Sequence, residues 1–424
     1  MKNLFNKIFS NSKNLNLFKE NIQNLTRKKP VGKIFDVINS YSSESEIRYV
    51  GGCLRKIFNN EEVDDIDLAT NLHPSEVSKI LKEKRINFYE TGIEHGTITA
   101  IINDCKFEIT SLREDIFTDG RHAKVKFSKD WKKDALRRDF TFNAIYSDLN
   151  GNLFDPFNGK KDLENGEVNF IGDAEKRIQE DYLRILRYIR FFSIYSKQPH
   201  KEKVTKIIKI NINGISRISK ERLLDELKKL LVSTNLEKIS NDKFSIDLLS
   251  IIFPELKNIK VTLKLCSDKK NLFKSLDFIF ILSLMIIEEK DNLEYFLYKY
   301  NISKKNQKRL RIINDFYKQK INPKSFNETK LNSIFYYHGK QVVLDILNFK
   351  TFKSKKKDKE ILNLFELFKN KKTPSLPIGA DTLMSKYSIP EGKQLGVKLK
   401  LIEEVWVKNN FKISDKQIDS IVKS

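Results

Sequence analysis

The stretch YVGGCLRKIFNNEEVDDIDLATN, residues 49–71, places two glycines after one short apolar run and an acidic cluster before another. Strands are expected at Ile47–Val50 and Ile66–Ala69. Because alternate residues of a strand face the same side, Asp65 and Asp67 share a face. Most acidic pairs of this kind lie on the protein surface without a function, so the meaning of this pair depends on its surroundings.

A third carboxylate is expected beside this pair. The segment TITAIINDCKFEITSL, residues 97–112, is typical of a β-hairpin with Asn103-Asp104 as its two-residue turn. Glu108, in the second strand of that hairpin, points away from the core by the same alternation. Three carboxylates on one face repel one another unless cations lie among them. Mg²⁺ favours such a site, because it binds a few carboxylates together with water and substrate phosphates.

The chain is strongly basic. It has 424 residues with 79 Lys and Arg against 56 Asp and Glu, which gives a formal net charge of +23. An excess of this size favours a polyanionic partner, most simply a nucleic acid, although a genome biased towards Lys, Asn and Ile would also raise the charge. The length exceeds what one hydrophobic core supports and predicts roughly two to four folding units.

Cysteine usage and hydropathy restrict the compartment. Cys53, Cys105 and Cys266 are far apart and odd in number, which excludes a disulfide framework and a Cys-x-x-Cys metal site and favours a reducing cytoplasm. The longest apolar run, Phe278–Ile287, is too short to cross a bilayer and is expected to be a core helix. No membrane partner is expected, and the first 25 residues predict a short leading helix rather than a signal peptide.

Two regimes follow each other along the chain. Residues 46–160 alternate strand and helix signals, including a helix opened by Pro74 and continued over Ser75–Glu83. Beyond about residue 160 the pattern is helical, with long amphipathic helices expected over 174–196 and 219–233. The C-terminal part has a lysine-rich stretch, a loop with two prolines and a final helical module with Trp406 and Phe411; the stretch and the loop span 352–360 and 373–381.

Several motifs occur in a fixed order. They are GG-x-x-R and D-x-D within 51–67, FEITSLR (107–113), RRDFTFNAI (137–145), DPFNG (155–159), EDYLRILRYIRF (180–191) and RISKERLLDEL (217–227). In this order they resemble the bacterial-type, or class II, tRNA nucleotidyltransferase and poly(A) polymerase family. The resemblance covers roughly residues 46–230; the rest of the chain is similar only in its helical character and in LPIGADTL before a Trp.

The resemblance implies a role for each motif. Asp65 and Asp67 would carry catalytic magnesium ions, with Glu108 as a third carboxylate. Arg138 would contact the triphosphate. The remaining residues expected to contact the nucleotide or shape its pocket are Gly52, Arg55, Asp139, Asn143, Arg187 and Arg190.

A further motif, E-D-x-x-R, implies base recognition by Asp181 and Arg184, which follow Glu180. On a continuous helix these two residues lie one turn apart, and Arg187 and Arg190 continue the same ladder. The carboxylate accepts hydrogen bonds and the planar guanidinium donates them, so together they match the edge of cytosine or adenine. The alternative is an ordinary exposed ion pair on a helix.

The resemblance also implies an architecture. We expect an α+β protein with a polymerase-beta-like, mixed α/β nucleotidyltransferase head followed by an all-helical neck, body and tail. The expected segments are an N-terminal extension (1–30), the head with the catalytic carboxylates (31–160), the neck with base recognition (161–235), the body (236–350) and a tRNA-binding tail (351–424).

The implied activity is template-independent addition of CCA to the 3′ end of tRNA from CTP and ATP, with release of pyrophosphate and a two-metal mechanism. Mg²⁺ is the expected cofactor, and no protein partner is indicated. The compact segment REDIFTDGRHAKVKF (113–127) is similar to CCA-adding members. A poly(A) polymerase is the alternative, and a CC- or A-adding tRNA enzyme a further one, although Asp119-Gly120-Arg121 argues against CC addition alone. The carboxylates and Arg184 argue against a non-enzymatic RNA-binding module.

The chain departs from the family pattern after the glycines. Lys56 stands where the family usually has Asp, and Ile57-Phe58-Asn59 replaces the usual Leu-Leu-Gly. Neither change removes an expected metal ligand. The sequence contains no P-loop or G-x-G-x-x-G motif and no His-Asp dipeptide, and its scattered histidines give no support to a zinc site.

Overall fold

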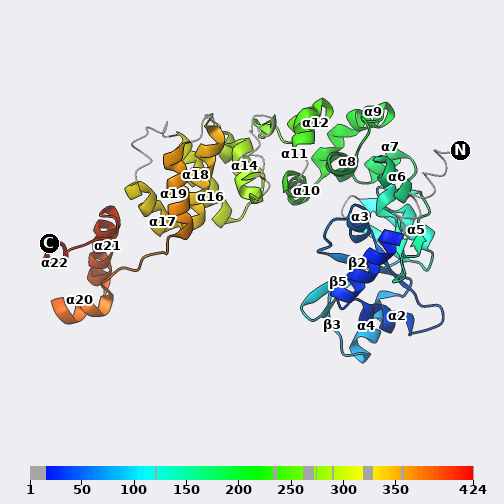
Figure 1. Cartoon of the computed structure of the whole chain (residues 1–424), viewed down its shortest axis with the longest axis horizontal. Coiled ribbons are helices and arrows are strands. Elements are labelled where there is room, and N and C mark those ends of the chain that lie inside the picture. Colours follow the sequence, from blue (N-terminus) through cyan, green and yellow to red (C-terminus); the bar gives the residue numbers. More distant parts are fainter. Residues whose placement is uncertain are drawn as a thin grey trace. The chain divides into compact units, whose positions relative to one another are not determined.

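The computed structural model describes residues 16–119, 122–232, 236–260, 272–273, 275–288, 291–318, 328–354 and 358–423. It divides into two compact units, Met1–Leu227 (unit 1) and Lys228–Ser424 (unit 2) (Figure 1). Gly120, Arg121, Cys266 and Lys355–Lys357 lie outside the described residues, as do the first 15 residues of the expected leading helix. Residues 16–28 of that helix are helical.

The described part of unit 1 contains a seven-stranded sheet of order β3-β4-β5-β2-β1-β8-β9 and a separate hairpin, β6-β7. β2 and β5 run parallel, while the other neighbouring strands are antiparallel. The strands are β1 Ile47–Val50, β2 Ile66–Thr70, β3 Asn87–Gly92, β4 Thr97–Ile102, β5 Cys105–Ser111, β6 Arg113–Asp119, β7 His122–Phe127, β8 Tyr146–Ser147 and β9 Leu153–Phe154.

The expected strands and hairpin are confirmed. Ile66 and Leu68 of β2 are buried, as the alternation of side chains requires. The turn between β4 and β5 has positive φ at both central residues, 48° at Asn103 and 61° at Asp104, which is the backbone of a type I′ turn. Asn and Asp tolerate this conformation better than other residues with a side chain, which explains why the hairpin forms here.

Some of the helices of unit 1 pack on its sheet. α3 packs on β1 and β2, α2 on β1 and α4, and α4 on β3 and β4. α4 begins at Pro74, as expected, with the backbone N–H of His73 donating to Glu76 Oε2 at 2.8 Å. The helices are α2 Gly32–Asn39, α3 Gly52–Phe58, α4 Pro74–Glu83, α5 Trp131–Leu136, α6 Gly159–Asn165, α7 Ala174–Glu180, α8 Leu183–Tyr195, α9 Glu202–Asn211 and α10 Lys220–Val232, with 3₁₀ turns at Ile93–His95, Thr141–Asn143 and Ile212–Arg217.

The expectation of one long helix over 174–196 is wrong, because the helix breaks at Asp181. α7 ends at Glu180, and Asp181 has an extended backbone with φ −153° and ψ 102°. The Asp181 carboxylate accepts a hydrogen bond from the backbone N–H of Leu183 at 3.1 Å and so caps the start of α8. An aspartate competes in this way with the helical backbone, although the apolar periodicity continues through the break.

An aromatic cluster joins α8 to the segment that carries the RRDFTFN motif. Phe140 and Phe142 are fully buried, and each packs against Phe191 with ring centroids 5.3 Å apart. Phe170 stacks on Tyr188 at 5.8 Å in the same cluster. This packing fixes α8 against the polar residues that alternate with the phenylalanines, among them Asp139 and Asn143.

The described part of unit 2 contains helices joined by loops, and no strand. One core is formed by α16 to α19 and contains Phe335, Val343 and Phe368; a second core, with Leu383 and Ile402, is formed by α20 to α22. The helices are α11 Leu236–Asn241, α12 Lys243–Ile252, α14 Phe278–Ile286, α15 Asn292–Lys299, α16 Lys304–Lys318, α17 Glu328–His338, α18 Lys340–Lys353, α19 Lys359–Asn370, α20 Ala380–Tyr387, α21 Lys393–Lys408 and α22 Asp415–Lys423.

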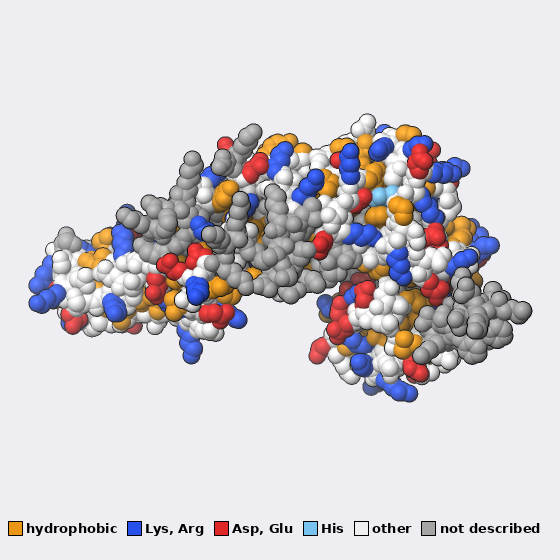
Figure 2. All heavy atoms as spheres, turned by 45° about the horizontal axis from the view of Figure 1, so that its top comes forward, with side chains coloured by type: hydrophobic (Ala, Val, Ile, Leu, Met, Phe, Trp, Pro, Cys, Tyr) orange, Lys and Arg blue, Asp and Glu red, His pale blue; other side chains and the backbone are white. Residues whose placement is uncertain are grey.

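Three expectations for this half of the chain are confirmed. The apolar run at Phe278 forms the buried helix α14, residues 371–379 form a loop, and Trp406 packs against Phe411 at 5.0 Å. None of the helices in the described ranges combines the length and hydropathy needed to cross a bilayer. Lys and Arg side chains are spread over both units on the face seen in Figure 2.

Candidate active site

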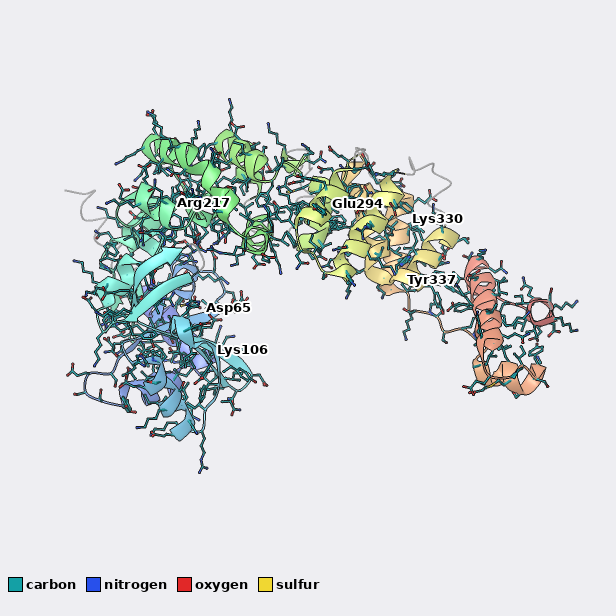
Figure 3. The ribbon with its side chains drawn as sticks, turned by 180° about the vertical axis from the view of Figure 1, so that it is seen from behind. Asp65, Lys106, Arg217, Glu294, Lys330 and Tyr337 are labelled. Atoms are coloured by element: carbon teal, nitrogen blue, oxygen red, sulfur yellow. The ribbon has the colours of Figure 1, made fainter. Side chains whose placement is uncertain are left out.

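Two neighbouring parallel strands bring carboxylates together in unit 1. The register of β2 and β5 places Asp67 directly opposite Glu108, and Asp65 lies just before β2 (Figure 3). Burial raises the pKa of Asp67, and repulsion from Asp65 adds to this, while Arg138 and Arg55 act in the opposite direction. Burial, followed by repulsion from Asp67 and Asp65, raises the pKa of Glu108. The carboxylates therefore carry an electrostatic penalty that a bound cation would relieve.

The described residues contain no group of three or more His, Cys, Asp or Glu side chains close enough to form a complete protein cage for a metal. Mg²⁺ does not need such a cage, because it retains several waters and commonly binds one or two carboxylates plus substrate phosphates. The oxygen donors and mutual repulsion of Asp65, Asp67 and Glu108 thus fit Mg²⁺ better than a metal that requires nitrogen or sulfur ligands.

The glycine pair allows the backbone to approach these carboxylates. Gly51 has φ +70° and ψ −116°, a conformation that L side chains rarely adopt, and α3 starts at the next residue. A Cβ atom on Gly52 would lie only 3.6 Å from Asp67 Oδ2 and 3.7 Å from a guanidinium nitrogen of Arg55. Gly51 therefore suits its backbone conformation, whereas a Cβ atom on Gly52 would make ordinary van der Waals contacts with Asp67 and Arg55.

Several arginines meet around the Phe191 ring. The guanidinium carbons of Arg55, Arg187 and Arg190 lie 5.0, 5.4 and 4.1 Å from its centroid. Burial lowers the pKa of Arg190, the carboxylate of Glu226 counteracts this, and Arg187 and Arg55 lower the pKa further by repulsion. Within the described part of the chain, Nε of Arg55 is buried without a hydrogen-bond partner. Such a cluster favours a bound polyanion such as a triphosphate.

Arg138 lies close enough to Asp67 to lower the pKa of its carboxylate. Its Nε and Nη2 donate to Asp134 Oδ2 at 3.2 and 3.1 Å, and its Nη1 donates to the backbone oxygen of Asn143 at 3.4 Å. Asp134 is almost fully buried and also accepts a hydrogen bond from the Tyr146 hydroxyl at 2.6 Å. Asp134 therefore holds the guanidinium of Arg138 in a fixed orientation near Asp67.

Asp139 and Asn143 connect neighbouring elements of the site through hydrogen bonds. Asn143 Nδ2 donates to Asp139 Oδ1 at 2.5 Å, and Asn143 Oδ1 accepts a hydrogen bond from Arg55. The other carboxylate oxygen of Asp139 accepts from Arg187 Nε at 2.7 Å. The structure thus connects α3, the 3₁₀ turn and α8 through these side chains.

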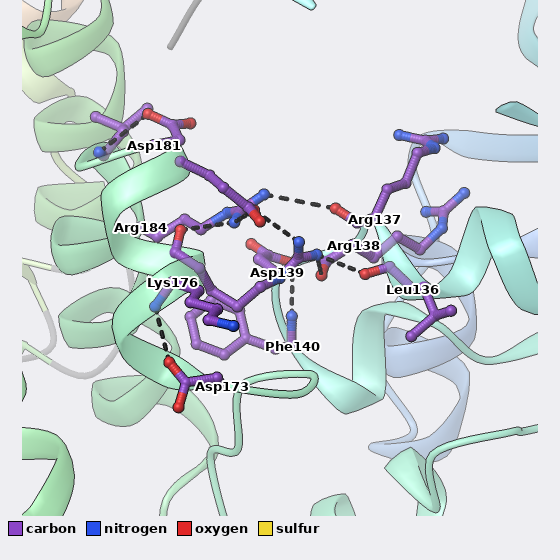
Figure 4. Close-up of polar contacts among 12 residues, drawn as sticks. Leu136, Arg137, Arg138, Asp139, Phe140, Asp173, Lys176, Asp181 and Arg184 are labelled. Atoms are coloured by element: carbon purple, nitrogen blue, oxygen red, sulfur yellow. Dashed lines mark hydrogen bonds and ion pairs between the residues drawn. The ribbon is translucent and has the colours of Figure 1, made fainter. Parts of the chain in front are cut away.

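The side chains of Asp181 and Arg184 do not form an ion pair with each other, and Asp181 lies at the break between α7 and α8. Asp181 Oδ2 accepts from Arg222 Nη2 at 2.7 Å. Arg184 Nη1 instead donates to Glu180 Oε2 at 2.6 Å; Asp181 and Arg184 are labelled in Figure 4. The ladder of arginines begins only at Arg184, on α8. Neither residue therefore forms the helical ion pair that was the alternative interpretation.

The comparisons with known proteins agree with this geometry. The model described as "Poly A polymerase head domain" matches residues 47–169, and the model described as "Probable RNA and SrmB- binding site of polymerase A" matches 201–260. The chain is 32% identical over 399 residues to "CCA tRNA nucleotidyltransferase 1, mitochondrial" of Homo sapiens, covering 89% of this chain and 86% of the relative. It is 30% identical over 342 residues to the "CCA-adding enzyme" of Listeria innocua, covering 80% and 84%.

The chain belongs to the class II tRNA nucleotidyltransferase and poly(A) polymerase family. The fold expected for this family is confirmed by its likeness to the CCA-adding enzyme of Bacillus stearothermophilus in complex with CTP. That structure has a TM-score of 0.68 and 20% identity, and the match covers 93% of this chain and 97% of the other. The expected segment boundaries within the family architecture remain predictions.

Four charged residues that contact the expected site residues were not identified from the sequence. Asp134 binds Arg138, Arg177 binds Glu180, Arg222 binds Asp181, and Glu226 accepts from Arg190 Nε at 2.5 Å. Glu226 and Arg222 lie in the RISKERLLDEL motif, and Asp134 lies four residues before Arg138, so the signal was proximity to motif residues. The partners of Arg222 and Glu226 could not be identified from the sequence, because those contacts join elements distant in sequence.

Proposed function

We propose that this protein adds CCA to the 3′ end of tRNA from CTP and ATP without a nucleic-acid template. The observation that carries the proposal is the placement of Asp67 opposite Glu108, beside Arg55 and Arg138. A carboxylate pair next to phosphate-binding guanidinium groups suits nucleotidyl transfer. The name of the human relative, which matches most of the chain, supports tRNA as the acceptor, and the name of the Listeria relative supports CCA addition.

The proposed reaction is an in-line displacement at phosphorus. The 3′-hydroxyl oxygen of the RNA attacks the α-phosphate of the incoming nucleotide, the bond to the bridging oxygen of the β-phosphate breaks, and pyrophosphate leaves. The hydroxyl proton passes to solvent or to a nearby carboxylate. Bound Mg²⁺ would supply charge neutralisation at the attacking and leaving oxygens.

Different residues would bind the metal and neutralise the triphosphate. Asp65 and Asp67 would hold Mg²⁺, with Glu108 as the neighbouring carboxylate. Arg55 and Arg138 neutralise the charge that remains on the triphosphate, and they are held near it by Asn143 and Asp134. Because Asn143 and Asp134 orient these guanidinium groups, stabilising the charge of the transition state should need little reorganisation of the site.

The remaining arginines extend the nucleotide site along α8. Arg187 and Arg190 are the further triphosphate contacts, and each is oriented by a buried carboxylate, Asp139 or Glu226. Asp181 and Arg184 choose the base by hydrogen bonding to its edge. Since each has a protein partner in this structure, base binding would have to use their remaining donors and acceptors or displace those partners.

Single-nucleotide assays test the activity. The full-length protein is incubated with a tRNA that ends before CCA and with one labelled nucleotide at a time. Addition of C residues from CTP alone, and of one A residue only after C addition, is expected. A long ladder of A residues from ATP alone would instead identify a poly(A) polymerase, and C addition without A would identify a CC-adding enzyme.

A chelation experiment tests the metal proposal. Removal of divalent ions should abolish addition, and Mg²⁺ should restore it, whereas tRNA binding should depend on the metal only weakly because Lys and Arg side chains carry it. Full activity in excess chelator would refute the assignment of Asp65 and Asp67.

We also propose that the protein works in the cytoplasm. Cys53 is buried and free, and Cys105 is free, as expected in a reducing compartment. The human relative carries the word mitochondrial in its name. Fractionation of cells with an antibody against the chain tests the location, and recovery in an organelle fraction would overturn it.

A further inference from the structure

Arg177, on α7, links two parts of the proposed site. Its Nη2 donates to the backbone oxygens of Leu136 at 2.6 Å and Arg138 at 2.5 Å (Figure 4). Its Nη1 donates to Glu180 Oε2 at 2.6 Å. The Arg177 side chain is 12% exposed, and its contact with Leu136 lies at the surface. Arg177 therefore connects the backbone at Arg138, the arginine proposed to bind the triphosphate, to Glu180, the last residue of α7.

The same residue fixes the position of Arg184. Arg184 Nη1 donates at 2.6 Å both to Glu180 Oε2 and to the backbone oxygen of Arg177. One carboxylate oxygen of Glu180 thus accepts hydrogen bonds from both guanidinium groups. Each of the two arginines therefore limits the movement of the carboxylate that they share. Glu180 is 34% exposed, so without Arg177 its side chain would gain rotational freedom and Arg184 would lose a fixed partner.

We propose that Arg177 is a positioning residue that sets nucleotide selectivity by fixing Arg184 relative to Arg138. The proposal rests on the proposed function, because it assumes that Arg184 reads the incoming base. Selectivity of this kind requires the reading group to be rigid, since a mobile donor can adapt to the wrong base edge. Arg177 itself does not contact the base.

Lysine cannot replace Arg177 in this role. Three of its contacts use two nitrogens of one planar guanidinium, which reach Glu180 in one direction and the backbone oxygens of Leu136 and Arg138 in another. An ammonium group keeps the charge but is a single point with no planar fork. Arg177→Lys should therefore keep the positive charge but lose the contacts either with Glu180 or with the backbone oxygens of Leu136 and Arg138.

The test compares Arg177→Lys and Arg177→Ala with wild type and with Lys176→Ala. Lys176 is a matched control, because it is the neighbouring cation on α7 and is exposed. kcat/KM is measured for CTP and UTP on tRNA ending before CCA, and for ATP and GTP on tRNA ending in CC. Circular dichroism melting establishes folding for every variant.

We expect the preference for CTP over UTP to fall about tenfold or more in Arg177→Ala, the scale of effect caused by small misplacement of a positioned group. Arg177→Lys should lose part of the preference, and Lys176→Ala should retain the wild-type ratio. Equal losses for all four nucleotides, or an unchanged ratio, would overturn the proposal. If Arg177→Ala does not fold, Arg177→Lys decides by the same criterion.

Failure of the proposed function has a different signature. In that case wild type itself adds no CCA. If wild type instead extends RNA with A residues, the ATP-to-GTP ratio in the same variants supports or overturns the role of Arg177.

Discussion

Replacing Asp134 with Ala should destabilise unit 1 strongly. The Asp134 side chain is 1% exposed and forms ion pairs with Arg137 at 2.7 Å and Arg138 at 3.1 Å, whose side chains are 15% and 17% exposed. Its removal leaves two largely buried cations without their shared anion and the Tyr146 hydroxyl without its acceptor. Breaking a buried pair in this way costs about 3–5 kcal/mol. For a unit of this length the melting temperature should fall by about 6–20 °C.

Differential scanning calorimetry of the full-length protein measures the effect, with the transition of unit 1 followed separately from that of unit 2. Tyr146→Phe leaves both ion pairs in place. It removes the hydrogen bond donated to the Asp134 carboxylate and the one accepted from Arg138 Nε, and should cost about 1.5–3 kcal/mol. Asp36→Ala, at an exposed aspartate of α2, is the matched control and should change the melting temperature little. A decrease for Asp134→Ala no larger than that of the control would show that the ion pairs do not stabilise the fold.

The pH dependence of this contribution has a definite sign. Burial alone would raise the pKa of Asp134, but Arg137, Arg138 and the Tyr146 hydroxyl hold it well below its ordinary value of 3.8. The stabilisation is therefore present in full above about pH 4 and is lost only as the pH falls through the folded-state pKa. The melting-temperature difference between wild type and Asp134→Asn should stay constant from about pH 8 to 5 and narrow below about pH 4; a difference that narrows at neutral pH would contradict this.

Three further results are expected. Asp65→Ala or Asp67→Ala should abolish nucleotide addition and leave the Kd for tRNA nearly unchanged in a filter-binding assay; near-normal turnover with Mg²⁺ would refute the metal assignment. The affinity for tRNA should fall steeply with salt, and replacing the exposed Lys400 with Ala should reduce the slope by about one if it contacts a phosphate; an unchanged slope would remove it from the interface. Arg184→Ala and Asp181→Ala should relax discrimination against UTP and GTP by about 1–3 kcal/mol in kcat/KM, whereas an equal decrease for all four nucleotides would assign the pair a structural role.

Much of the fold could be predicted because its signals are local. Pro74 starts α4, and Asn103-Asp104 allows the turn between β4 and β5. The break at Asp181 could not be predicted, since the apolar positions keep their helical period through it and the ion pair with Arg222 joins residues distant in sequence.

For the candidate site, too, some residues could be predicted from the sequence and others could not. Motif residues such as Asp67 and Arg138 were identified by their order in the chain, and the structure brings them together. Asp134 and Arg177 were missed, because a charged residue near a motif is usually solvent-exposed, and only the folded chain shows that both are buried and shared between partners. The roles of all these residues in the reaction await the experiments above.

The parallel pairing of β2 with β5 has a consequence for the order of folding. The hairpin of β4 and β5 closes across a two-residue turn, so it can form on the microsecond scale from local contacts. β2 can join β5 only after the intervening α4, β3 and β4 have been brought into place, which is a slower, non-local step. Asp67 and Glu108 therefore meet late, when the surrounding chain is already compact, and mutations in β2 should slow folding less than they speed unfolding.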